Sequence, residues 1–204
     1  MEGVVVACLG DSITAGSPLW DPDAAVRARI GAAADERSQW LWWAGRLEPQ
    51  LELRNFGVYG ERTDEIAARL DGAVAGAHVL VVQGGINDVV QRRPVEQAAR
   101  NLAGMVQRAR GLGLGVALAD VLPWNNGDGR AAHEIARLNV LIRALADGLG
   151  VTLLPFHETL ADPDRPHRMR AEWTDDGDHP SVEGHRLLGE RAFRLPQGET
   201  ATSL

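Results

Sequence analysis

Lysine is absent from this 204-residue sequence, in which all 21 basic residues are arginine. A chain without lysine cannot form a Schiff base through its own side chains, hold pyridoxal phosphate through a lysine or carry a Walker A motif. Acidic residues outnumber basic ones by 28 to 21, so the formal net charge is -7. Because nucleic-acid binders normally present a basic face, we expect no nucleic-acid partner.

Cysteine and long apolar runs are scarce as well. Cys8 is the only cysteine, which excludes an intramolecular disulfide and a zinc–cysteine cluster. It lies in an apolar run, so we interpret it as a small buried side chain. No apolar stretch approaches the roughly 18 residues of a membrane span, and the first ten residues lack the basic segment of a signal peptide. The sequence therefore predicts a cytoplasmic protein without an integral membrane segment.

Short apolar runs alternate with helical patterns along the chain. Several of the runs are almost continuous in Val, Leu and Ala, as expected for strands buried on both faces. This alternation predicts an α/β fold, a three-layer α/β/α sandwich around a five-stranded parallel sheet. The predicted strands lie at 4–9, 51–58, 78–85, 114–122 and 151–156, and the predicted helices at 38–51, 63–74, 94–113, 131–150 and 181–193.

The chain contains no linker, internal repeat or low-complexity segment. We therefore expect one domain over residues 1–194, followed by a flexible tail at 195–204. Segment 17–37 is the least regular part, and we expect a loop there with a short helix. Thr63 is the expected N-cap of the helix at 63–74.

Polar residues follow the predicted strands. In open parallel sheets, ligands bind beyond the carboxyl ends of the strands, so we expect these residues to converge at one edge. They are Ser12 after the first strand, Gly60 after the second, Asn87 after the third, Trp124 to Asn126 after the fourth, and Asp175 to His179 before the last helix.

Ser12 and His179 suggest nucleophilic catalysis. Asp176 precedes His179 by three residues, and a turn of that length can fold the carboxylate onto Nδ1 of the imidazole, leaving Nε2 to accept the Ser12 proton. Two other interpretations remain open: Ser12 as a helix N-cap, and the acidic loop as a solvated turn. A metal site built from Asp175, Asp176, Asp178 and His179 is a further alternative, although it lacks EF-hand spacing and a histidine pair at helical spacing.

Acyl transfer also needs donors for the developing oxyanion. The backbone N–H of Ser12, a backbone N–H in the Gly60 turn and the side-chain amide of Asn87 are the candidates. Ordinary roles as turn or cap residues remain open for Gly60 and Asn87. A non-catalytic α/β binding domain would also be compatible with each of these residues taken singly.

Four motifs together resemble the blocks of the SGNH/GDSL hydrolases, a family of esterases and lipases: GDSIT at 10–14, NFGVYGERT at 55–63, GGIND at 84–88 and DGDH at 176–179. The resemblance implies a flavodoxin-like sheet and hydrolysis of small or medium-chain acyl esters without metal or cofactor. Carried over position by position, it implies Ser12 as nucleophile, His179 as base, Asp176 as its carboxylate, and Ser12, Gly60 and Asn87 as the oxyanion hole. Carbohydrate O-deacetylase, acyl thioesterase and lysophospholipase activities are the alternatives within this family.

Trp20, Trp124 and Trp173 fall in loops predicted at the same edge. Aromatic side chains there suit an acyl chain, an aryl group or a sugar ring, so all three are candidate substrate-binding residues. Simple packing at the rim is the alternative. Trp40, Trp42 and Trp43 follow helical spacing, and we expect most of this second cluster to lie in the core.

Overall fold

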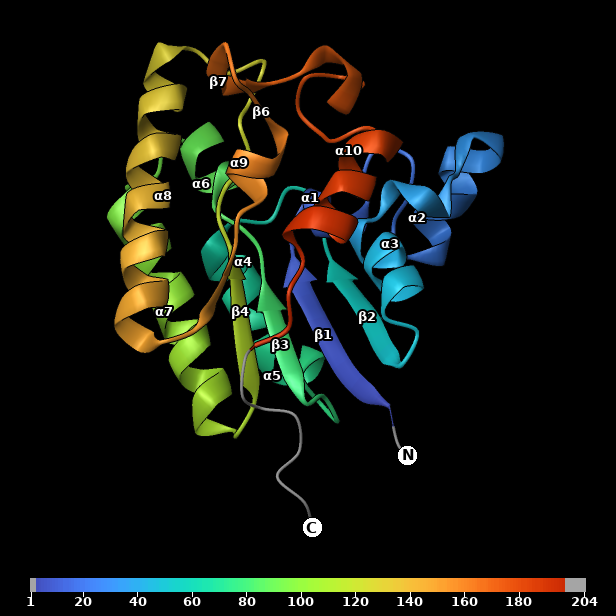
Figure 1. Ribbon diagram of the computed structural model, residues 1–204, viewed down its shortest axis with the longest axis vertical. Coiled ribbons are helices and arrows are strands. Elements are labelled where there is room, and N and C mark those ends of the chain that lie inside the picture. Colours follow the sequence, from blue (N-terminus) through green and yellow to red (C-terminus); the bar gives the residue numbers. More distant parts are fainter. Residues whose placement is uncertain (1–2, 197–204) are drawn as a thin grey trace.

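The computed structural model describes residues 3–196. Its centre is a five-stranded parallel sheet in the order β2-β1-β3-β4-β5, with the carboxyl ends of the strands pointing to the top of Figure 1. This is the flavodoxin order, so the fold expected from the sequence is confirmed. The strands are β1 (Val4–Gly10), β2 (Leu51–Gly57), β3 (Val79–Val82), β4 (Gly115–Ala119) and β5 (Thr152–Leu154).

Strand β1 lies at the point where the strand order reverses. The chain first leaves it for β2 on one side and later returns to β3 on the other, with Gly10 paired to Gly57 and Leu9 paired to Val82. A crevice opens beyond the carboxyl end of a strand in this position, because the two crossover connections leave in opposite directions. The residues that follow Gly10 therefore enter the crevice directly.

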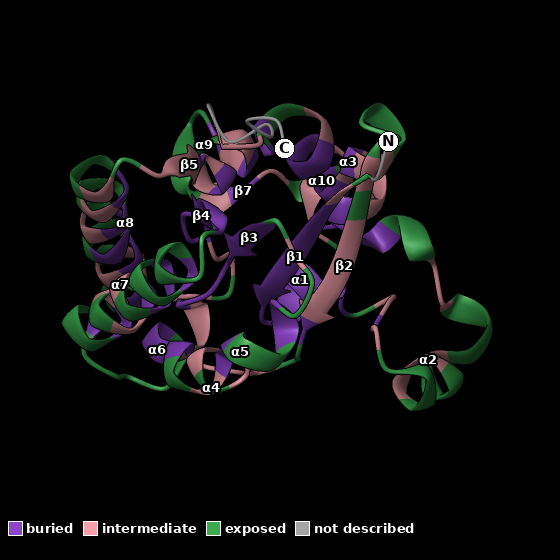
Figure 2. Cartoon of the chain, turned by 90° about the horizontal axis from the view of Figure 1, so that it is seen from below, coloured by how far each residue is buried: buried purple, intermediate pink, exposed green. Residues whose placement is uncertain are grey.

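Side chains of the inner strands alternate between two buried clusters. Leu9 and Leu80 belong to the cluster under α4 (Thr63–Ala68), α5 (Leu70–Ala73), α7 (Val95–Gly111) and α8 (Gly129–Leu149). Cys8 and Val81 belong to the opposite cluster, covered by α3 (Trp40–Leu47), α9 (Phe156–Leu160) and α10 (Val182–Leu187). Figure 2 shows the resulting three layers, with the inner strands buried. Burial of both faces explains why these strands read as continuous apolar runs.

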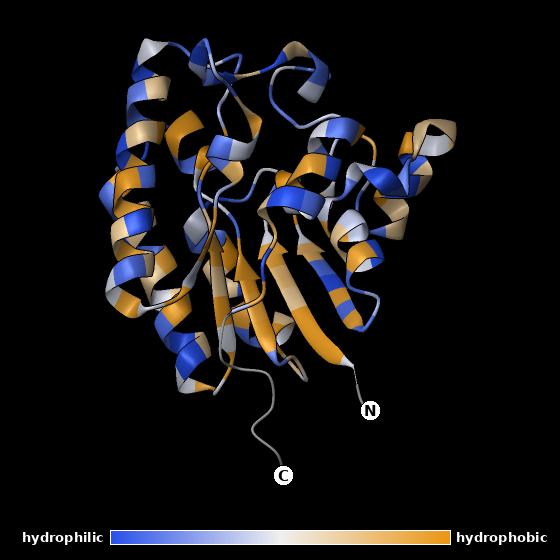
Figure 3. Cartoon of the chain, viewed as in Figure 1, coloured by the Kyte–Doolittle hydropathy of each residue, from blue (hydrophilic) through white to orange (hydrophobic). Residues whose placement is uncertain are grey.

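The edge strand β2 has a different composition from the inner strands. It alternates in hydropathy, whereas β1, β3 and β4 are mainly apolar (Figure 3). Glu52 is exposed, and it accepts a hydrogen bond from Arg54 at 2.7 Å. Charged side chains on an edge strand also discourage pairing with other chains.

Several short elements differ from the expectation because they hold too few residues for a periodic pattern. They are α1 (Ser12–Ala15), α6 (Ile86–Val90), α9, the 3-10 turn Ala171–Trp173, and a hairpin of β6 (Ala161–Asp162) and β7 (Arg165–Met169). Segment 17–37 does hold a short helix, α2 (Ala24–Ile30), followed by two 3-10 turns at Gly31–Ala33 and Glu36–Ser38. Helix α10 continues into a π-helical segment at Leu188–Ala192.

The N-cap of α4 is Arg62 and not Thr63, because Thr63 is the first helical residue and directs its hydroxyl to Asp88 instead. Cys8 is fully buried as expected, and this burial raises the pKa of its thiol.

The single domain over 1–194 stays a prediction, and residues 197–204 of the predicted tail lie outside the described residues. Within 3–196, no helix combines the length and apolar character that crossing a membrane requires.

Candidate active site

Ser12 begins helix α1, directly after strand β1. Asp11 caps this helix: its Oδ1 accepts a hydrogen bond from the backbone N–H of Ile13 at 2.9 Å. Gly16 ends the helix in the left-handed conformation, with φ at 103°, and donates to the Ser12 carbonyl at 3.0 Å. Because the capping carboxylate comes from Asp11, the Ser12 hydroxyl is not used as the cap.

Close backbone packing fixes the position of α1. A Cβ at Gly57, at the end of β2, would lie 2.1 Å from the backbone nitrogen of Ala15. On the other side, Gln83 Oε1 accepts hydrogen bonds from Asp11 N at 3.3 Å and from Thr14 Oγ1 at 2.9 Å. A glycine at 57 therefore lets the helix approach the edge strand, while Gln83 holds it against the end of β3.

The structure brings Ser12, His179 and Asp176 into one hydrogen-bonded line. His179 Nε2 lies 3.1 Å from Ser12 Oγ, and His179 Nδ1 lies 2.8 Å from Asp176 Oδ2. Ser12 and His179 are 167 residues apart in the chain, and they meet because β1 and the loop before α10 end at the same edge of the sheet. The predicted nucleophile and carboxylate thus each lie within hydrogen-bonding distance of the predicted base, His179.

The Asp176 carboxylate also shapes the turn that carries His179. Its Oδ1 accepts hydrogen bonds from the backbone N–H groups of Asp178 at 2.8 Å and His179 at 2.7 Å. Thr174 closes the turn, accepting from Gly177 N at 2.9 Å and donating to the His179 carbonyl at 2.7 Å. Partial burial acts to raise the pKa of Asp176, but the hydrogen bonds from the His179 ring and the turn outweigh it and lower the pKa. Asp176 is therefore ionised near neutral pH.

The loop after β4 braces this turn from outside. Trp124 Nε1 donates to Asp178 Oδ1 at 2.6 Å, and Asn126 Nδ2 donates to the same oxygen at 2.7 Å. Asn126 Nδ2 also donates to the Asp176 carbonyl at 2.8 Å. A Cβ at Gly177, where φ is 83°, would come within 2.7 Å of the Asn126 amide. Tight packing and hydrogen bonds together therefore hold the turn in one position.

Gly60 and Asn87 face the same cavity as Ser12. Gly60 adopts a left-handed conformation with φ at 79°, which favours glycine. Asn87, on α6, donates a hydrogen bond from Nδ2 to the Glu61 carbonyl at 2.9 Å. A side-chain amide has two N–H donors, so this bond orients the amide and leaves a second donor. Both predicted oxyanion positions thus lie beside Ser12.

Arg69 and Glu61, which the sequence analysis did not single out, fix the loop between β2 and α4. Arg69 donates to Glu61 Oε2 at 2.6 Å, to the Phe56 carbonyl at 3.1 Å and to the Gly10 carbonyl at 3.2 Å. One guanidinium group therefore ties the Gly60 loop to the ends of β1 and β2. No sequence motif marks this role, because Arg69 resembles any other arginine on an amphipathic helix.

Asp11 is fully buried directly before Ser12. Burial raises its pKa to about 6, although hydrogen bonds from Ile13 and Gln83 and the charge of His179 act in the opposite direction. Its Oδ2 has no hydrogen-bond partner among the residues the structure describes. The other oxygen of Asp11 caps α1, the helix that begins with Ser12.

A cavity of about 150 Å³ surrounds the Ser12 hydroxyl. Its polar lining comes from Ser12, Gly60, Asn87, Asp178 and His179, and its apolar lining from Ile13, Tyr59, Ile86, Val90 and Trp124. Tyr59 was missed by the sequence analysis, although it immediately precedes Gly60. Its ring centroid lies 5.9 Å from that of His179.

Of the three tryptophans predicted to contact substrate, the structure brings only Trp124 to this cavity. The Arg27 guanidinium covers the Trp20 ring at 4.8 Å, and the Arg170 guanidinium covers the Trp173 ring at 4.9 Å. Trp173 also packs against the core cluster that contains Cys8. Trp20 and Trp173 are thus engaged in packing and do not line the cavity, so their contact with substrate stays a prediction.

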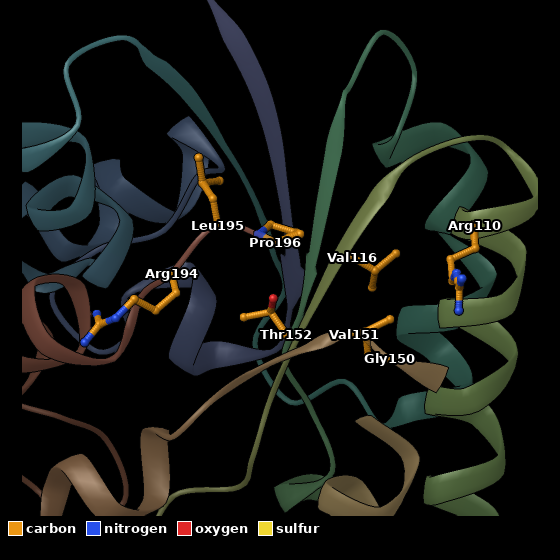
Figure 4. Close-up of a pocket in the computed structure, with 8 residues that line it drawn as sticks. All are labelled: Arg110, Val116, Gly150, Val151, Thr152, Arg194, Leu195 and Pro196. Carbon is orange, nitrogen blue, oxygen red and sulfur yellow. The ribbon is translucent and has the colours of Figure 1, made fainter. Parts of the chain in front are cut away.

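A larger cavity of about 460 Å³ lies at the opposite edge of the sheet, by the amino ends of β4 and β5 (Figure 4). Arg110 and Arg194 lie on opposite sides of it. Each directs a guanidinium N–H to a backbone carbonyl, of Leu149 and Phe193 respectively. This cavity is therefore separate from the convergent polar residues.

In the acidic loop 175–179, the carboxylates of Asp176 and Asp178 are engaged in hydrogen bonds. Within residues 3–196, no three His, Cys, Asp or Glu side chains are grouped so as to hold a metal ion. Asp178 Oδ1 is used by Trp124 and Asn126, and both oxygens of Asp176 are used by the turn and by His179.

Comparison with protein families agrees with this geometry. A model of the GDSL-like lipase/acylhydrolase family matches residues 8–187. The chain belongs to this family. The resemblance expected from the four motifs is confirmed, and with it a hydrolase of the esterase and lipase type. None of the curated proteins compared with the chain matches it in sequence.

Solved structures of GDSL proteins share the fold. A lipolytic-family protein of the G-D-S-L type from Desulfitobacterium hafniense is 23% identical, with a TM-score of 0.75 over 92% of this chain and 96% of its own. A GDSL-like lipase from Bacteroides thetaiotaomicron is 21% identical, with a TM-score of 0.70 over 92% and 84%. A variant of an acetyl xylan esterase from Geobacillus stearothermophilus is 19% identical, with a TM-score of 0.70 over 93% and 92%. At these identities the likeness shows the fold.

Proposed function

We propose that this GDSL-family chain hydrolyses carboxylic esters of small or medium acyl chains through a Ser12-His179-Asp176 triad. The observation that supports it best is the unbroken line of contacts from Ser12 Oγ to His179 Nε2 at 3.1 Å and from His179 Nδ1 to Asp176 Oδ2 at 2.8 Å. A serine hydroxyl is a weak nucleophile unless a base removes its proton, and this arrangement supplies the base together with the group that orients it.

In the acylation step, Ser12 Oγ forms a bond to the ester carbonyl carbon as its proton passes to His179 Nε2. Asp176 accepts the Nδ1–H bond and stabilises the imidazolium that results, since its lowered pKa keeps it ionised. The tetrahedral intermediate then breaks the bond to the alcohol oxygen, which takes the proton from His179. In deacylation, water attacks the acyl-serine ester with the same histidine as base, and the acid and free Ser12 are regenerated.

The carbonyl oxygen becomes negatively charged in both steps. We assign its stabilisation to the backbone N–H groups of Ser12 and Gly60 and to the second N–H of the Asn87 amide. The hydrogen bond from Asn87 to the Glu61 carbonyl holds that amide before substrate arrives. Donors fixed in advance stabilise the charge without reorganising during the reaction. The mechanism proposed here uses no metal and no cofactor.

Steady-state hydrolysis of 4-nitrophenyl acetate and butyrate tests the proposal. We expect Ser12→Ala and His179→Gln each to lower kcat by about 10⁴-fold or more, and the double variant to be no worse than either single one, because the two residues act as a unit. His133→Gln is the matched control, since His133 lies exposed on α8. Turnover by folded Ser12→Ala equal to that of the wild type would overturn the proposal.

A further inference from the structure

We propose that the cavity beside Ser12 accepts short acyl groups in preference to long ones, and that Trp124 is the residue that sets this limit. The proposal rests on the ester hydrolysis proposed above and narrows its substrate class. Three properties of the described residues support it: the small volume of the cavity, the separation of its polar and apolar lining, and the fixed position of the Trp124 ring.

The cavity is small, at about 150 Å³. Sites that enclose drug-sized ligands span about 300–1,000 Å³. The size of the cavity therefore favours a short acyl chain. A longer chain would have to leave the cavity or displace one of its walls.

The walls indicate which part of an ester occupies the cavity. Ser12, Gly60 and Asn87 mark the position of the reacting carbonyl. The rest of the lining is mostly apolar, so the hydrocarbon attached to that carbonyl has to lie among these side chains. During turnover the alcohol departs, whereas the acyl group stays bonded to Ser12 Oγ until water attacks. The acyl group is therefore the part whose size the cavity restricts.

Trp124 is the fixed wall. Its Nε1 donates to Asp178 Oδ1 at 2.6 Å, and that oxygen is held in turn by Asn126 Nδ2 at 2.7 Å. A Cβ on Gly127 would lie 2.6 Å from Trp124 Cε3, so the ring lies directly against the Gly127 backbone. The indole also packs against the core cluster that contains Leu9. Rotation of the indole would break its hydrogen bond to Asp178 and remove its packing against Gly127 and the core.

Two other apolar walls are much more exposed. Tyr59 is 66% exposed and Val90 is 46% exposed, so either side chain can move toward solvent at little cost. Trp124 is both large and restrained, and it comes from the loop that braces the catalytic turn. The size limit is therefore assigned to Trp124, with Asp178 holding it in place.

The test compares kcat/KM for 4-nitrophenyl acetate, butyrate and octanoate. For the wild type we expect acetate and butyrate to exceed octanoate by about tenfold or more, because a filled apolar pocket rejects extra methylenes. Trp124→Ala should raise the ratio of octanoate to acetate by at least about tenfold. Trp124→Phe keeps a ring against Gly127 and should retain the preference for short chains. Trp42→Ala is the matched control, because Trp42 lies on α3 and does not line the cavity.

The outcomes separate this inference from the proposed function. Wild-type enzyme that hydrolyses octanoate as well as acetate, or a folded Trp124→Ala enzyme with an unchanged ratio, would overturn the size limit while leaving ester hydrolysis intact. If Trp124→Ala fails to fold, the kcat/KM values of Trp124→Leu and of the wild type for the same three esters test the size limit. Failure of the proposed function has a different signature: no turnover of any ester and no covalent labelling by diisopropyl fluorophosphate, a result that would remove this inference as well.

Discussion

Thr63 donates two hydrogen bonds to the two carboxylate oxygens of Asp88, from its backbone N–H at 2.9 Å and from its hydroxyl at 3.0 Å. Asp88 directly follows Asn87, and Thr63 lies three residues after Gly60. The pair therefore fixes the loop that carries one proposed oxyanion donor against the helix that carries the other. Asn101 completes the contact by donating to the Thr63 hydroxyl at 2.9 Å.

We expect Asp88→Asn to weaken both folding and catalysis. An amide presents only one acceptor oxygen, so one of the two Thr63 donors is left facing an N–H group inside the protein. The expected loss is about 1–3 kcal/mol in the free energy of unfolding, measured by urea denaturation. We also expect kcat to fall by about tenfold, since the oxyanion donors lose their alignment. Asp64→Asn, at an exposed position, is the control, and an Asp88→Asn variant with wild-type stability would contradict this account.

Asn87→Ala tests the oxyanion assignment itself. Removal of one such donor typically lowers kcat by about 10²–10³-fold with a smaller change in KM, because the bond forms mainly in the transition state. Hydrolysis of 4-nitrophenyl acetate measures both constants. Asn101→Ala serves as a comparison, because Asn101 contacts Thr63 and does not line the cavity. An Asn87→Ala enzyme with unchanged kcat would exclude the amide as an oxyanion donor.

Much of the fold could be predicted because the inner strands are short runs of Val, Leu and Ala, buried on both faces. Helices α7 and α8 were predicted as well, since each is long enough to show a repeating apolar stripe. Helices α1 and α6 have four and five residues, fewer than two turns, and leave no such pattern. The position of α1 depends on contacts made by Gln83, which lies far away in the sequence. Such contacts cannot be seen from local composition.

The candidate site could likewise be predicted only in part from the sequence. Ser12, Asp176 and His179 could be predicted to meet because the fold class places the carboxyl ends of all strands at one edge. Which tryptophan lines the cavity could not be predicted, because Trp20, Trp124 and Trp173 have equivalent positions in the predicted topology. What separates them are their individual partners: Asp178 holds Trp124 at the cavity, whereas Arg27 covers Trp20.

The raised pKa of Asp11 predicts a specific dependence of stability on pH. Burial raises its folded pKa to about 6, from an ordinary value of 3.8. As the pH rises from about 4 to about 6, the unfolded chain loses this proton while the folded chain keeps it, so the free energy of unfolding falls. Asp11→Asn retains the oxygen that caps α1 and cannot ionise. Relative to this variant, we expect the wild type to lose about 3 kcal/mol between pH 4 and pH 7.

Urea denaturation of both proteins at several pH values measures this difference. Asp23→Asn is the control, because Asp23 also caps a helix, α2, but lies at its exposed surface. Parallel pH profiles for the wild type and Asp11→Asn would show that Asp11 does not titrate in this range.

The lowered pKa of His185 predicts the opposite dependence of the free energy of unfolding on pH. It is fully buried on α10, and neither ring nitrogen has a hydrogen-bond partner within residues 3–196. Burial, with the nearby charge of His179, lowers its pKa to about 3. The unfolded chain gains a proton below about pH 6.5 while the folded chain does not, so the stabilisation is complete above that pH and is lost as the pH falls.

We expect His185→Leu to remove this loss. Between pH 7 and pH 4, the free energy of unfolding should fall by about 3 kcal/mol more in the wild type than in the variant. The same denaturation series measures it, with His133→Leu as the exposed control. Equal slopes for the wild type and His185→Leu would mean that the buried ring is protonated in the folded protein.

The central claim is that Ser12 is an activated nucleophile, and covalent labelling tests it without any assumption about the substrate. Purified wild type and Ser12→Ala are treated with a small fluorophosphonate, and the intact mass of each is measured. The account predicts one adduct per chain on the wild type and none on Ser12→Ala. A folded wild type without an adduct, or equal labelling of both proteins, would contradict it.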